Sequence, residues 1–176
     1  MGFAIIASVL LGAVMTLGDW LWAALSLRHR VVYGLAHGAL MCLCLGLAVG
    51  VRAGRPAPAA LAGPVIGVAA AASFYALAPL MRWSAMFPAW MLLWILFAVL
   101  QQRLSRRETI GTALLRGAAA SLLSGAAFYA ISGIWINDSH DNPSLIRHFG
   151  AWTFAFVPGF MALFFTGSRD PRNTRG

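Results

Sequence analysis

The feature that most constrains this 176-residue chain is how little charge it carries. Only 10% of its residues are charged, whereas 60% are hydrophobic. A water-soluble globule of this length needs more polar residues than that to cover its surface. The composition therefore excludes a soluble globular domain and predicts a protein whose solvent is lipid.

The scarce charge is also mostly of one sign. The sequence has no lysine, and its thirteen arginines outnumber the five carboxylates to give a formal net charge of +8. Nucleic-acid binding would require a folded basic surface, and the only free basic segment is the short tail at 167–176. We therefore expect no nucleic-acid partner.

Chemical motifs are absent as well. The chain has no nucleophile elbow, phosphate-binding glycine loop or paired-histidine metalloprotease helix. Its two cysteines, Cys42 and Cys44, lie two residues apart in one apolar run, so they would point to different sides of a helix and form no disulfide. No motif indicates a cofactor, and enzyme activity has no support from a motif.

Long apolar runs are what the sequence has in abundance. Each is near the roughly 20 residues needed to cross a hydrocarbon core, and runs of this length without alternation form helices rather than barrel strands. We therefore predict an all-α, polytopic membrane protein with six transmembrane helices in a single domain at 1–166, followed by a basic cytoplasmic tail at 167–176. The runs cover about 3–26, 32–51, 59–80, 86–101, 111–135 and 149–166.

An internal repeat divides these runs into three hairpins. In each, an apolar segment ends in a small-residue or aromatic cluster, turns over and restarts with an alanine followed by a ring. The clusters are 18–20, 73–76 and 127–130, and the restarts are 36–37, 89–90 and 151–152. Hairpins that enter the membrane in the same orientation are related by an axis along the membrane normal, which predicts a pseudo-threefold bundle. Runs of small residues at 63–72 and 117–120 predict that the third and fifth helices lie at its centre.

The arginines orient the bundle. Most lie in the second loop, the fourth loop and the tail, which share one side of the membrane. Because short arginine-rich loops stay in the cytoplasm, we expect an inner (plasma) membrane protein with both termini cytoplasmic. The arginines on this side are Arg52, Arg55, Arg103, Arg106, Arg107, Arg169, Arg172 and Arg175.

The first hairpin departs from the other two in its chemistry. Asp19 stands where the later units carry Phe74 and Phe128, and His37 stands where they carry a tryptophan. Both lie at nearly equal depth from the turn, so we expect them to meet. Ionisable residues inside a membrane are functional candidates by default. Three roles stay open: a polar pair that fixes the hairpin, a ligand or proton site, and residues that face separate cavities.

The third hairpin has a polar insertion between its helices. This segment, 137–148, carries Asp138, His140, Asp141 and His148 and is expected on the outer side. A lid, part of a substrate or metal site, a docking surface and a plain connector rich in turn formers all fit it.

A metal site or a haem site could also be formed by residues of the first hairpin and of the polar insertion. The histidines show no tight zinc spacing. His37 and His148 both lie near the outer ends of helices, where they would suit a haem as axial ligands, and a non-haem metal would draw on Asp19, His37, Asp141 and His148.

Our leading hypothesis from the sequence is a membrane protein that binds or transports a small or lipophilic molecule. Its outward-facing pocket would be lined by Asp19, Trp20, Tyr33 and His37, with the loop at 137–148 as its lid. Membrane lipids, a small-molecule ligand, a second copy of the chain and a larger membrane complex are the expected kinds of partner. The alternatives are an accessory or assembly subunit of such a complex, and an intramembrane enzyme or a metal- or haem-binding protein.

Overall fold

The computed structural model describes residues 1–25, 29–106, 108–137 and 144–164 and folds them into six α-helices. Each helix coincides closely with one predicted apolar run, so the all-α prediction is confirmed. A short 3₁₀ turn at Arg82–Ala85 joins the third helix to the fourth. The helices are α1 Gly2–Ala24, α2 Arg30–Ala53, α3 Pro56–Met81, α4 Met86–Ser105, α5 Ile110–Asn137 and α6 Leu145–Phe164.

Five of these helices, α1 to α5, are long and apolar enough to cross a membrane. The chain is therefore a multi-pass membrane protein. The last helix, α6, has 20 residues but does not reach the same hydropathy, because its first turn contains Arg147 and His148.

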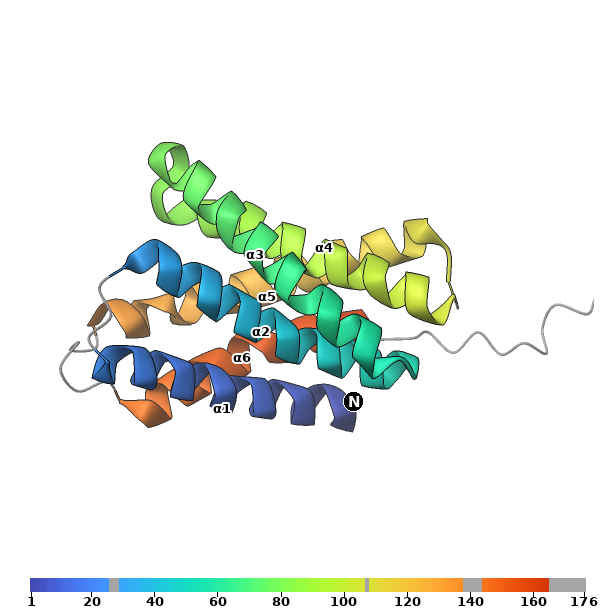
Figure 1. Ribbon diagram of the computed structural model, residues 1–176, viewed down its shortest axis with the longest axis horizontal. Helices are drawn as coiled ribbons and strands as arrows, with labels where there is room; N and C mark the ends of the chain where they lie inside the picture. Colours follow the sequence, from blue (N-terminus) through green and yellow to red (C-terminus); the bar gives the residue numbers. More distant parts are fainter. Residues whose placement is uncertain (26–28, 107, 138–143, 165–176) are drawn as a thin grey trace, which may run out of the picture.

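The helices run alternately up and down the bundle (Figure 1). One end, which we call the terminal end, holds the N-terminus, the α2–α3 and α4–α5 connections and the end of α6. The opposite end holds the last turns of α1, α3 and α5 and the first turns of α2, α4 and α6, and we call it the Asp19 end because Asp19 lies near the last turn of α1.

The bundle closes in chain order. Each helix contacts the next, and α6 returns to contact α1. The most extensive contact joins α2 to α3, which belong to different predicted hairpins, while α1 and α2 touch only slightly. The pseudo-threefold arrangement of three hairpins stays a prediction.

The prediction that the third helix lies at the centre is wrong. Only 17% of the membrane-spanning window of α3 is buried, against 39% for α1, α2 and α4. Its small residues serve one close contact instead, because a Cβ at Gly63 or Gly67 would overlap a backbone carbonyl oxygen of α2. Small residues thus indicate that two helices approach closely, and a helix at the edge of a bundle can use them as well as a central one.

Aromatic side chains of α4 and α6 fill the centre. Trp94 and Phe97 of α4 and Phe156 and Phe160 of α6 are fully buried. The Trp94 indole packs directly on Gly159, where any Cβ would overlap the ring. These contacts hold α6 in the bundle and fix the position of its first turn. Cys42 and Cys44 are free thiols, as predicted.

Candidate functional site: a carboxylate that joins three helices

Asp19 is contacted by side chains from two other helices. Its side chain is 15% exposed. The Tyr33 hydroxyl of α2 donates a hydrogen bond to Oδ1, and the Trp152 indole N–H of α6 donates one to Oδ2 at 2.8 Å. Both carboxylate oxygens therefore have a donor, which offsets the cost of removing a carboxylate from water.

Two imidazoles flank the same carboxylate. Nδ1 of His37 lies 3.4 Å from Oδ1 and Nδ1 of His148 lies 3.7 Å from Oδ2. These distances are within ion-pair range but long for hydrogen bonds. The predicted meeting of Asp19 and His37 is confirmed, and His148 joins them from the first turn of α6. We call Asp19, Tyr33, His37, His148 and Trp152 the Asp19 cluster.

Aromatic rings enclose the cluster. The Tyr33 ring lies between Trp22, with ring centroids 4.5 Å apart, and His37, at 5.0 Å. The His37 ring is 5.4 Å from Trp152, which in turn lies 6.2 Å from Phe128. These rings cover part of Asp19, whose side chain is 15% exposed, and a hydrogen bond shielded from water in this way is strengthened.

His37 has a polar atom that is not used within the cluster. Nε2 of His37 is buried and has no hydrogen-bond partner among the described residues. A buried nitrogen without a partner costs free energy, and native structures contain few of them. This atom marks a position where a polar group of a bound molecule would be stabilised.

The predicted site residues divide into three groups. Asp19, Tyr33, His37 and His148 are brought together by α1, α2 and α6. Trp20 is 47% exposed and, as the neighbour of Asp19 along the helix, points to another side of α1. Asp138, His140 and Asp141 lie outside the described residues, so the role of their loop stays a prediction.

Two contributors were not assigned to the site from the sequence. Trp152 donates directly to Asp19, and Trp22 packs on Tyr33. A signal for Trp152 was present, because it occupies in the third hairpin the position of His37 in the first. The closure of α6 onto α1, which brings Trp152 to Asp19, has no such signal.

The metal alternative can be compared with the geometry of the described residues. Within them, no group of three or more histidine, cysteine, aspartate or glutamate side chains is arranged to hold a metal ion. Asp141, which was one of the four candidate ligands, is not among them.

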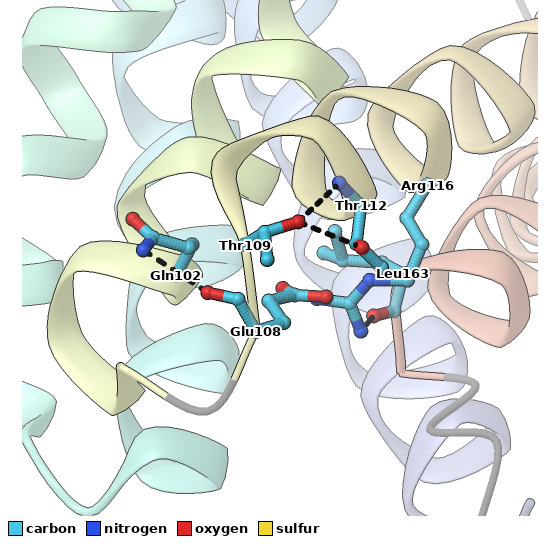
Figure 2. A network of polar contacts seen from close by, with 6 residues as sticks. All are labelled: Gln102, Glu108, Thr109, Thr112, Arg116 and Leu163. Atoms are coloured by element: carbon cyan, nitrogen blue, oxygen red, sulfur yellow. Dashed lines mark hydrogen bonds and ion pairs between the residues drawn. The ribbon is translucent and has the colours of Figure 1, made fainter.

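A second polar network lies at the terminal end (Figure 2). Arg116 of α5 pairs with Glu108 and also donates to the Leu163 carbonyl of α6 at 2.7 Å. Gln102 donates to the Glu108 carbonyl at 3.2 Å. The network ties the α4–α5 turn to the end of α6, a role that the sequence did not reveal for Arg116.

Comparisons of the chain with protein-family models, with curated proteins and with solved structures find no match.

Proposed function

We propose that this protein binds a small, lipophilic molecule at the Asp19 cluster. The observation that carries the proposal is the buried His37 Nε2 without a partner, beside a carboxylate contacted from two further helices. Ionisable groups are costly between membrane helices and are retained mainly where they act.

The two histidines are not the only polar side chains that contact Asp19. Tyr33 and Trp152 already supply a donor to each oxygen of Asp19. Each oxygen thus has one donor apart from His37 and His148, and both imidazoles are held within 4 Å of the carboxylate. The number of polar side chains around this one carboxylate favours a site that binds a further molecule.

The surroundings indicate the chemistry of that molecule. Trp22, Tyr33 and Trp152 provide aromatic walls, and small-molecule sites of this kind take a largely apolar ligand whose few polar groups fix its orientation. The ligand would be an aromatic or other lipophilic molecule with one hydrogen-bonding group, which His37 Nε2 would meet.

The proposed topology places the site on the outer side of an inner membrane. We include α6 as a sixth span, because its 20 residues extend about 30 Å and it packs between α1 and α5. Arginines are more numerous at the terminal end, which supports cytoplasmic termini. The ligand would then reach the Asp19 cluster from outside, and inward transport would be an extension of this binding step.

A pair of matched probes tests the proposal on the full-length protein in detergent. 1-Naphthol and naphthalene share a ring system, but only 1-naphthol has a hydroxyl group. We expect the wild type to bind 1-naphthol roughly tenfold more tightly, the equivalent of one hydrogen bond, as measured by ligand-dependent thermal shifts. His37→Phe should remove this preference, and Trp20→Phe, a change at the exposed neighbour of Asp19, should retain it. An equal response to both probes in the wild type, or a preference that survives in His37→Phe, would refute the proposal.

A further inference from the structure

An open pocket lies between the end of α4 and the start of α5, at the opposite end of the bundle from the Asp19 cluster. Its volume is about 470 Å³, and it is lined by Gln102, Arg103, Arg106 and Ile110. Two exposed arginines, a glutamine and an isoleucine therefore line one open pocket.

The positive charge of this pocket is not neutralised within the described part of the chain. Glu108 is the nearest carboxylate in sequence, and it is paired with Arg116. Figure 2 shows its carboxylate directed toward Arg116, while its backbone carbonyl accepts the Gln102 hydrogen bond. No ion pair among the described residues involves Arg103 or Arg106. The two guanidinium groups are thus available to an anion.

The backbone supports the same arrangement. Arg106 ends α4 in the left-handed conformation, with φ 51° and ψ 26°, and its N–H bonds to the Gln102 carbonyl at 2.7 Å. The equivalent position at the end of α2 is a glycine, Gly54, with φ 73°. A residue with a side chain is disfavoured in this conformation, because its Cβ approaches the following carbonyl oxygen, so the arginine stands at the pocket against a local conformational preference.

We propose that this pocket binds the phosphate group of an anionic phospholipid. It lies at the end of a helix that is long enough to span the membrane, which is the depth of lipid headgroups. Arginine pairs with phosphate oxygens through two parallel hydrogen bonds, and Ile110 provides an apolar surface for the adjoining glycerol and acyl carbons. Free inorganic phosphate has the same oxyanion chemistry, and the experiment distinguishes the two sources.

The test uses the full-length protein in a zwitterionic detergent. Phosphatidylglycerol, phosphatidylcholine and inorganic phosphate are each titrated, and the melting temperature is followed. We expect phosphatidylglycerol alone to raise the melting temperature. Since a basic residue near an anionic headgroup contributes about a fivefold gain in affinity, the double variant Arg103→Gln/Arg106→Gln should bind on the order of 25-fold more weakly. The matched control is Arg52→Gln, which removes an exposed arginine from the last turn of α2 at the same end and should bind as the wild type does.

Three results would overturn the proposal. They are an equal response to phosphatidylglycerol and phosphatidylcholine, an equal response to inorganic phosphate, and an equal loss of affinity in Arg52→Gln and the double variant. If the double variant does not fold, Ile110→Trp replaces it, because this change fills the pocket and keeps both guanidinium groups. That variant should also lose the response to phosphatidylglycerol, and a response like that of the wild type would equally refute the site.

Discussion

At the scale of single residues, the two donors to Asp19 come from helices far apart in the chain. Tyr33 is 14 residues from Asp19 and Trp152 is 133 residues from it. Each donates to a different oxygen, so removing one leaves the other oxygen satisfied. The carboxylate therefore links α1 to α2 and to α6 through a separate bond on each oxygen.

We predict that Tyr33→Phe and Trp152→Phe each lower the free energy of unfolding by about 1.5–3 kcal/mol, because each removes a hydrogen bond to a charged group and keeps an aromatic ring. The double variant should lose more than the sum, since its carboxylate would have neither donor. Denaturant unfolding in detergent, arranged as a double-mutant cycle, measures both quantities.

Tyr75→Phe is the matched control for this prediction. The Tyr75 hydroxyl donates to the Arg30 carbonyl at 2.6 Å and is exposed, so its loss should cost about 0.5–1.5 kcal/mol, as for a neutral hydrogen bond. If Tyr33→Phe costs no more than Tyr75→Phe, the bond to Asp19 is not charge-assisted.

The site residues that could be predicted from the repeat are those whose chemistry differs from that of the equivalent residues in the other hairpins. Asp19 and His37 were found because each replaces a ring of the other hairpins, and their meeting followed from equal depth in one hairpin. Trp152 occupies the position of His37 in the repeat but keeps the ring of the other hairpins, so it was not singled out as a site residue. Its contact with Asp19 depends on the closure of α6 onto α1, which is set by packing across the whole bundle.

At the scale of elements, α2 and α3 are held together by backbone contact. A Cβ at Gly67 would overlap the Gly38 carbonyl oxygen, whereas a Cβ at Gly150 of α6 would meet nothing within 4 Å. The same change, glycine to alanine, can therefore be compared at two helical positions that differ in the space available.

We predict that Gly67→Ala destabilises the protein by about 1–3 kcal/mol, the usual cost of overpacking, because a carbonyl oxygen cannot rotate away as a side chain can. Gly150→Ala should be neutral or stabilising by up to about 1 kcal/mol, since alanine favours a helix over glycine. Thermal unfolding of both variants measures the difference, and equal effects would show that the α2–α3 contact can relax at little cost.

The Glu108–Arg116 pair joins three elements at the terminal end. Its side chains are only 15% and 14% exposed, and Arg116 also holds the carbonyl at the end of α6. We predict that Glu108→Gln or Arg116→Gln alone costs about 3–5 kcal/mol, because the remaining charge is buried without its partner. The double variant should be less destabilised than the sum of the two, as measured by unfolding in a double-mutant cycle. Single-variant costs below about 1 kcal/mol would instead be those of a solvent-screened surface pair.

At the scale of the whole molecule, the sequence predicted the helices well and their arrangement poorly. Apolar length is a local property, so each of the six runs could be matched to a helix. Whether α3 lies at the centre or at the edge of the bundle could not be predicted. A run of small residues indicates that one helix packs closely against it, but not how many helices surround it. The small contact between α1 and α2 could not be predicted either, because the apolar length of two neighbouring helices does not determine how closely they pack.

One labelling experiment can test both the orientation of the protein in the membrane and whether α6 spans the membrane. In a Cys42→Ala/Cys44→Ala background, we introduce Ser84→Cys at the Asp19 end, Ala57→Cys at the terminal end and Gly176→Cys at the C-terminus. Ser84 and Ala57 are exposed. Because arginine-rich loops stay cytoplasmic, a membrane-impermeant maleimide should label Ser84→Cys in intact cells and label Ala57→Cys only after permeabilisation. Gly176→Cys should behave like Ala57→Cys if α6 spans the membrane and like Ser84→Cys if it does not. Labelling of Ala57→Cys in intact cells would reverse the orientation and place the Asp19 cluster on the cytoplasmic side.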